Sequence, residues 1–227
     1  MFQYLSILVV LQKMTKKHTP LFSLLLATSI ILSGCATKPN MAPEDNIQVI
    51  TSEQRTKQLL KNKKWQLKGK IAFIQQVNET DKRESASITW KVNEKKQTQD
   101  LNLTSYLGIN VLHLKSNQQQ HLIKVDGKEY RGANLSNLIY SLTGLILPTE
   151  ALTFWLKGLP YSIDDDLHVD EKTKLPKSMS SYYRNSIWQI NYNNYRSFNG
   201  LKMATKFTIK KDGLLIKVAV KNWSFID

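Results

Sequence analysis

The chain has 227 residues, a formal net charge of +14 and one cysteine. A single cysteine excludes an intramolecular disulfide, so a folded domain must rest on its apolar core. The basic balance leaves nucleic acid, an anionic membrane surface or an acidic protein as classes of partner.

Residues 13–35 contain the three ordered parts of a bacterial lipoprotein export signal. Lys13, Lys16 and Lys17 form a positive segment, and residues 21–32 are apolar but too short for a comfortable transmembrane helix. The tetrapeptide "LSGC" then ends at Cys35. The sequence therefore predicts a signal peptide over residues 1–34 and a lipid anchor on Cys35. The stretch before Met14 lacks a basic start, which favours Met14 as the true first residue.

Cleavage before Cys35 would leave 193 residues and a formal charge of +11. We expect a lipidated tether over residues 35–50, rich in Pro, Asn and Thr, and one domain over residues 51–227. Export and a lipid anchor argue against nucleic acid, which leaves a membrane or an acidic protein as partner. Ala36 follows the cysteine where aspartate would resemble an inner-membrane retention signal. We therefore expect an outer-membrane anchor with the domain facing the periplasm.

The first half of the domain alternates with a period of two after one short helix. Helix formers follow a cap at Thr51 or Ser52 and predict a helix over residues 51–62. Apolar residues then alternate in "WQLKGKIAF" and "SASITW", as in half-buried strands. Further strands are predicted around Leu101 and Leu103, then with either Ile109 and Val111 or Leu112 and Leu114 facing inward, and in a hairpin that turns at residues 126–127.

The second half contains a helical insert and then more strands. Leu135, Leu138, Ile139 and Leu142 recur at helical spacing until Gly144, and Pro148 opens a second short helix that ends before Gly158. Alternation returns over residues 188–192, 203–209 and 216–220. The pattern predicts a mainly β fold with a helical insert. A curved, incomplete antiparallel barrel with short helices over its concave side is the favoured architecture.

Catalytic and metal-binding patterns are thin in this sequence. His113 and His121 lie on strands that could be neighbours, but they offer two ligands where a zinc site needs three or four. The acidic residues between Asp164 and Glu171 lack the spacing of a calcium loop and are interpreted as a solvated loop. Neither a nucleophile elbow nor a nucleotide-binding motif is present. We therefore expect neither an enzyme nor a cofactor.

Large apolar side chains are unusually frequent on the predicted strands. They include Trp65, Phe73, Trp90, Trp188 and Phe207, with Trp155 on the second helix of the insert. A filled core and a concave ligand pocket both use such residues, and composition does not choose between them.

Six segments in order resemble the LolB family, outer-membrane lipoproteins that receive other lipoproteins from the periplasmic carrier LolA. They are "WQLKGKIAF", "SASITW", "LTSYLGINVLHL", "VDGKEYRG", "LTGLILPTEALTFWLKGLP" and "IKVAVKNW". The resemblance implies an incomplete LolA/LolB-like barrel with a hydrophobic cavity for acyl chains, no catalysis and no cofactor. It also implies a monomer that binds a LolA-like carrier, and a basic surface would attract an acidic rim on that carrier.

The resemblance also implies site residues. A protruding family loop carries an exposed leucine that places cargo in the membrane, and "YLG" matches it at Tyr106, Leu107 and Gly108, with Tyr106 where the family has proline. Candidates for the acyl-chain cavity are apolar residues of the strands and the insert: Trp65, Ile71, Phe73, Ile88, Trp90, Leu101, Leu103, Val111, Leu138, Leu142, Trp155 and Phe207.

Three other interpretations remain at this point. The domain could be an anchored carrier or sensor of another amphiphile, such as a phospholipid or glycolipid, because one fold hosts several functions. It could be a structural protein with a filled core, which would take up no lipid. It could also be an enzyme, although no constellation of catalytic groups supports this.

Overall fold

The structure is a computed structural model that describes residues 51–77, 80–144 and 146–225. The predicted signal peptide, the lipidated Cys35 and the tether over residues 35–50 lie outside these residues.

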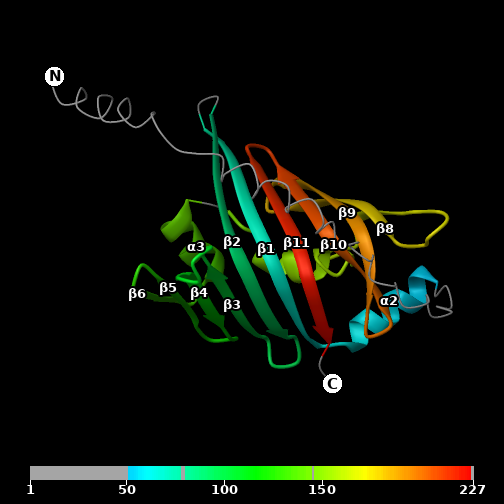
Figure 1. The fold of residues 1–227 in the computed structure, drawn as a ribbon, viewed down its shortest axis with the longest axis horizontal. Helices are drawn as coiled ribbons and strands as arrows, with labels where there is room; N and C mark the ends of the chain where they lie inside the picture. The colour runs from blue at the N-terminus through cyan, green and yellow to red at the C-terminus, as the bar shows by residue number, and fades with distance from the viewer. Residues whose placement is uncertain (1–50, 78–79, 145, 226–227) are drawn as a thin grey trace, which may run out of the picture. The chain divides into compact units, whose positions relative to one another are not determined.

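The described residues form one antiparallel sheet of eleven strands with three short helices (Figure 1). In spatial order the strands are β6-β5-β4-β3-β2-β1-β11-β10-β9-β8-β7, so β6 and β7 are the two free edges and the sheet stays open. Their bounds are β1 Lys64–Val77, β2 Thr80–Asn93, β3 Thr98–Thr104, β4 Asn110–Ser116, β5 His121–Val125, β6 Lys128–Gly132, β7 Asp166–Val169, β8 Pro176–Tyr183, β9 Ser186–Phe198, β10 Leu201–Lys211 and β11 Leu214–Phe225.

The helices begin and end at the residues that the sequence indicated. In α2 (Ser52–Lys61) the Thr51 hydroxyl accepts from the Gln54 backbone N–H, and the Gln54 side chain accepts from the Thr51 N–H in return. In α3 (Leu135–Thr143) Asn134 caps the start, and Gly144 ends the helix in the left-handed conformation. The last helix, α4 (Thr149–Trp155), follows Pro148. The predicted helical insert is confirmed.

Figure 1 shows where these helices lie against the sheet. The α4 helix lies behind the long central strands, α3 lies beside the shorter strands β3 to β5, and α2 lies at the end of the sheet near the C-terminus. The helices thus cover one face and one end of the open sheet, as the favoured architecture predicted.

Gly69 of β1 lies against the backbone of β11. The register between these strands shifts between Lys68 and Gly69 at a β-bulge. A Cβ atom built on Gly69 would lie 2.2 Å from the backbone oxygen of Ala219, so no other residue fits without a backbone shift. Gly69 therefore keeps the inward alternation of β1 in register while the two central strands stay in contact.

The interpretation of residues 164–171 as a solvated loop is wrong for its centre. Residues 166–169 form the short edge strand β7, which pairs with β8. Asp165 precedes β7 and is fixed in place: it accepts hydrogen bonds from the Tyr161 and Ser162 backbone N–H groups at 2.7 and 3.1 Å and from the Ser181 hydroxyl at 2.5 Å. The acidic side chains obscured the alternating pattern of a strand that is only four residues long.

Candidate functional site

An apolar cavity of about 360 Å³ lies on the helix-covered face of the sheet. Its wall consists mainly of inward-facing residues of β1 to β5, which alternate with outward polar residues as a half-buried strand requires, and Ile209 of β10 with Ile216 and Val218 of β11 complete it. Leu142 of α3, Leu152 of α4 and Leu156, which follows α4, cover it from the other side. A concave, largely apolar site of this size is typical of a small-molecule or lipid pocket.

The structure places eight of the twelve predicted cavity residues on the wall of this cavity and four elsewhere. The wall includes Ile71, Phe73, Ile88, Trp90, Leu101, Leu103, Val111 and Leu142. Trp65, Trp155 and Phe207 are almost fully buried in the main core, and Leu138 packs against a second, smaller core cluster.

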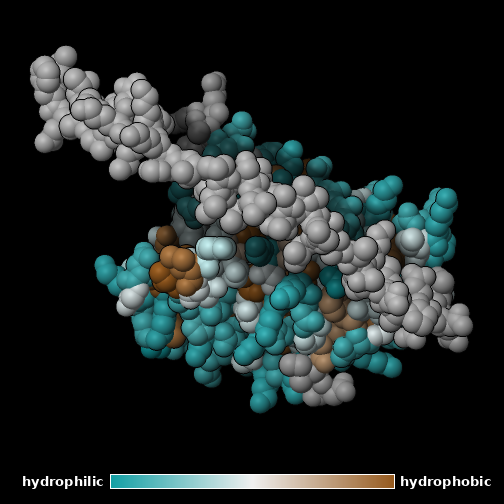
Figure 2. Space-filling model, in the orientation of Figure 1, coloured by the Kyte–Doolittle hydropathy of each residue, from teal (hydrophilic) through white to brown (hydrophobic). Residues whose placement is uncertain are grey.

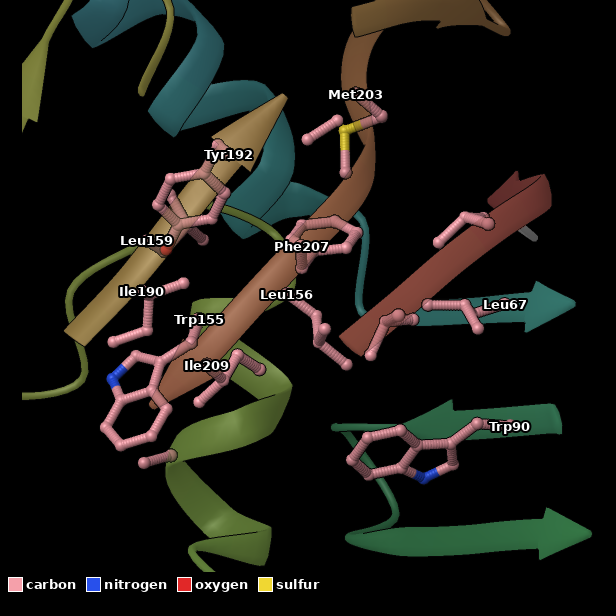
Figure 3. Packing of buried hydrophobic residues seen from close by; sticks show 14 of the residues in the cluster. Leu67, Trp90, Trp155, Leu156, Leu159, Ile190, Tyr192, Met203, Phe207 and Ile209 are labelled. Carbon is pink, nitrogen blue, oxygen red and sulfur yellow. The ribbon is translucent and has the colours of Figure 1, made fainter. Parts of the chain in front are cut away.

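Aromatic side chains fill the half of the concave face that has no cavity. Phe207 lies between Tyr192 and Leu156, with the Tyr192 and Phe207 ring centroids 5.8 Å apart (Figure 3). Trp155 packs against Trp188 with centroids 5.7 Å apart. Alternation places all these residues on the inner face. The large rings fill the space there, whereas the smaller aliphatic side chains of β3 to β5 leave space for the cavity.

Sequence reasoning missed several wall residues. It left the phase of β4 open, and the register now shows Leu112 opposite Leu103 and Leu114 opposite Leu101 on the inner face. Ile123 and Val125 continue the wall on β5. A signal was present, because the alternation of β4 and β5 continues that of β3 across the hairpins.

The predicted protruding loop joins β3 to β4 and is held by three hydrogen bonds. The Ser105 backbone N–H donates to the Ile109 carbonyl at 2.8 Å, the Gly108 N–H donates to the Ser105 carbonyl at 3.0 Å, and the Ser105 hydroxyl accepts from the Ile109 N–H at 3.3 Å. Gly108 adopts φ 78°, which glycine permits without strain. The turn is thus ordered without the proline that the family has at the position of Tyr106.

Apolar side chains of this loop project into solvent. Tyr106 is 97% exposed and Leu107 is 80% exposed, and Ile109 and Val111 follow on the same segment with 63% and 43%. A contiguous set of exposed apolar groups is unusual on a soluble surface and marks contact with lipid or protein. Figure 2 shows a patch of apolar surface in the region of α3.

The loop lies at the same end of the sheet as one polar end of the cavity. Thr98 pairs with Asn93 at the end of β2 and Thr104 with Ser87 near its middle, so β3 runs toward the β1–β2 hairpin and the turn after it lies on that side. At that end the cavity wall becomes polar, with Gln75, Lys82 and Glu84, and Lys82 and Glu84 form an exposed ion pair of 2.9 Å.

A polar cleft of about 540 Å³ lies at the opposite end of the same inner face. Its lining includes Glu94, His121, Glu150 and Arg184 with the aromatic rings of Phe154 and Tyr161. Burial lowers the pKa of His121, so this imidazole is predominantly neutral at pH 7. Gln99 of β3 belongs to the linings of both the cleft and the cavity.

Two buried cationic side chains, Lys157 and Arg55, hold elements around the cavity together. The sequence did not indicate either of them. Lys157 is 1% exposed and donates to Glu94, which also accepts from the Trp65 indole at 3.1 Å. Arg55 of α2 donates to the backbone carbonyls of Lys157 and Lys202 at 2.8 and 3.2 Å. Desolvation lowers the pKa of both Lys157 and Arg55. These bonds attach α2 to the segment after α4.

The histidine residues do not converge on a metal site. His113 contacts Asp100 at 3.0 Å, and His121 contacts the Ser116 hydroxyl at 2.7 Å. Among the described residues, no group of three or more His, Cys, Asp or Glu side chains is arranged to hold a metal ion. In the same part of the chain, no helix has both the length and the apolar character to cross a membrane.

Comparison with known proteins assigns the family. The family model described as outer membrane lipoprotein LolB matches residues 63–223. The chain belongs to the LolB family. Named outer-membrane lipoprotein LolB, the relative from Aeromonas salmonicida is 31% identical over 196 residues, covering 86% of this chain and 92% of its own. The Shewanella baltica relative of the same name is 28% identical and covers 94% and 92%.

Two solved structures of other proteins are similar to this LolB-family chain. A LolA superfamily protein from Nitrosomonas europaea covers 78% of this chain and 94% of its own, with a TM-score of 0.48 and 10% identity. A putative outer membrane lipoprotein-sorting protein domain from Vibrio parahaemolyticus covers 77% and 93%, with a TM-score of 0.47 and 8% identity.

Proposed function

We propose that this LolB-family protein is anchored to the outer membrane through lipid on Cys35 and receives acylated lipoproteins from a LolA-like periplasmic carrier. It acts as a monomer and without a catalytic step. Membership of a family of outer-membrane lipoproteins supports the location. The observation that carries the activity is the apolar cavity next to a turn whose leucine is 80% exposed.

Physical chemistry explains why such a protein needs a cavity and no energy source. Each methylene group of an acyl chain gains about 0.8 kcal/mol by leaving water, so a triacylated protein cannot cross the periplasm with its chains exposed. Transfer therefore runs from one apolar enclosure to the next. A tenfold preference at each step requires only about 1.4 kcal/mol. We propose that the wall residues Ile71, Phe73, Ile88 and Leu103 contact the chains.

The β3–β4 turn is proposed to deliver the cargo into the bilayer. Tyr106 suits the interfacial region, since its ring is apolar and its hydroxyl is polar, and Leu107 suits the apolar layer beneath. The hydrogen bonds within the turn hold both side chains outward. A membrane that receives the loop would thereby lie next to the end of the cavity.

The basic surface is proposed to speed docking of the carrier. Exposed lysines lie on the outward positions of the central strands, among them Lys68, Lys70, Lys206 and Lys217. They therefore face away from the cavity and act on the carrier through long-range attraction. Raising the salt concentration should slow transfer, and equal transfer rates at low and high salt would exclude this role.

Reconstitution tests the proposed function. Labelled lipoprotein bound to a LolA-type carrier is mixed with the purified protein and then with liposomes. Label should move first to the protein and then to the liposomes. Recovery of phospholipid from the protein, together with failure to accept lipoprotein, would instead favour a carrier or sensor of another amphiphile.

A further inference from the structure

The apolar cavity and the polar cleft are consecutive parts of one inner surface. On β3 the inward residues change from Leu103 and Leu101 in the cavity to Gln99, which lines both spaces. On β4 they change from Leu114 to Ser116, and on β5 from Ile123 to His121. Three neighbouring strands thus change from apolar to polar at the same level.

Three residues that line the cavity carry buried polar atoms without a hydrogen-bond partner within the described residues. The Trp90 indole N–H, the Thr149 hydroxyl and the Gln99 side-chain oxygen are buried and have no hydrogen-bond partner within the described residues. Trp90 is 4% exposed and Thr149 is 6% exposed. Gln99 is diagonally opposite Trp90 across the β2–β3 pair, since Trp90 pairs with Leu101. A buried polar group without a partner costs free energy, so each of these groups calls for a partner, either bound water or a polar group of a ligand.

We infer that these three groups bind the ester and amide linkages of an acylated, lipid-anchored peptide, an inference that rests on the proposed function. The indole N–H and the threonine hydroxyl donate to ester carbonyl oxygens, and the Gln99 oxygen accepts from an amide N–H. The acyl chains then fill the cavity and extend toward Gln75, while the peptide leaves through the polar cleft. The ends of the chains therefore point toward the end of the sheet that bears the exposed turn.

The inference explains why the polar groups lie inside and not at the end beside Leu107. A hydrocarbon chain alone would leave all three groups unsatisfied, whereas a diacylglyceryl-cysteine peptide carries ester carbonyls and an amide N–H within a few bonds of one another. The linkage would thus fix how deep the chains sit.

The test uses the purified protein and two synthetic probes with equal chains. One is a diacylglyceryl-cysteine peptide with ester linkages, and the other is its dialkyl ether analogue, which lacks the ester carbonyl oxygens. Trp90→Phe and Thr149→Val should each weaken binding of the ester probe by about three- to tenfold more than binding of the ether probe, as expected for one lost hydrogen bond.

Trp188→Phe is the matched control, because the Trp188 indole N–H is also buried without a partner among the described residues but does not line the cavity. It should leave the affinity for both probes unchanged. If the Trp90 and Thr149 variants bind the ester probe as the wild type does, the linkage site is excluded and bound water satisfies these groups. If the wild-type protein binds neither probe, the proposed function itself fails.

Orientation is tested by photo-crosslinking with a photoreactive residue in place of Gln118 in the cleft or Gln75 at the other end. The peptide part of the probe should crosslink from position 118. Crosslinking from position 75, or from neither position, would overturn the orientation.

Discussion

The two halves of the concave face follow the same alternation but differ in packing. All seven residues of β3 are half-buried, whereas Met203 and Phe207 of β10 are almost completely buried and do not line the cavity. Around β10 lie large rings, including those of Trp155 and Tyr192, while β3 faces aliphatic residues across an empty volume. Alternation therefore determines which residues face inward, and the volume of their side chains determines whether they form a filled core or a cavity.

The largest expected effect comes from removing a ring from the packed half. Trp155→Ala should lower the free energy of unfolding by about 3–5 kcal/mol, because it leaves a large void among rigid neighbours. Leu101→Ala on the cavity wall should cost about 1–2 kcal/mol, since this half-buried side chain already borders empty space. Urea unfolding measures both. Equal losses would contradict the division into a filled and an open half.

A larger side chain should be tolerated on the cavity wall but not in the packed half. Ile190→Phe in the packed half should destabilise the protein by about 1–3 kcal/mol, because the added atoms force neighbours out of their rotamers. Leu103→Phe should leave stability nearly unchanged and reduce uptake of an acylated probe, since the ring occupies the cavity. Thermal unfolding and probe titration give the two readings. A large destabilisation by Leu103→Phe would show that the cavity is not available space.

The exposed turn allows a change in delivery without a change in stability. Leu107→Glu should leave the unfolding free energy within about 0.5 kcal/mol and slow delivery of lipoprotein to liposomes about tenfold, because a carboxylate resists insertion into lipid. Ile163→Glu, at a 98% exposed residue in a different loop, is the control and should deliver normally. Delivery by the Leu107 variant at the wild-type rate would remove this leucine from the mechanism.

The smallest effect should be a pH dependence in the open half. Burial lowers the pKa of His121, and this effect outweighs a hydrogen bond with the Ala133 backbone and the charge of Glu150, which both raise the pKa. The unfolded chain therefore binds a proton first as the pH falls below about 6.5, and stability decreases between that value and the lower pKa of the folded state. His121→Gln should flatten this part of a plot of melting temperature against pH. An unchanged slope would assign the dependence to other groups.

Periodicity and turn chemistry were enough to predict most of the fold. The end of α3 at Gly144 and the hairpin at residues 126–127 are local and were predicted correctly, and the cap of α2 is Thr51, one of the two residues that the sequence offered. The strand β8 was missed because the inward residue Ser181 interrupts its apolar alternation, and its hydroxyl is satisfied by Asp165 only after folding.

The site was less predictable because it depends on packing between distant elements. Trp155 and Phe207 have the composition of a cavity wall, but they fill the core since Trp188 and Tyr192 meet them from β9. The groups of Trp90, Gln99 and Thr149 that have no partner in the described part of the chain come from two strands and a helix. No spacing in the sequence brings them together.

The order of strands also constrains how the molecule is assembled. The centre of the sheet joins β1 to β11, so the longest-range pairing of the fold is also the one that unites its two halves. A chain that emerges from its N-terminus cannot complete this pairing until residues 214–225 are available. Pairing of distant segments is slow because the entropy of closing a long loop is lost before any contact forms. Until then β1 presents an open edge, whose unpaired backbone groups could pair with another chain.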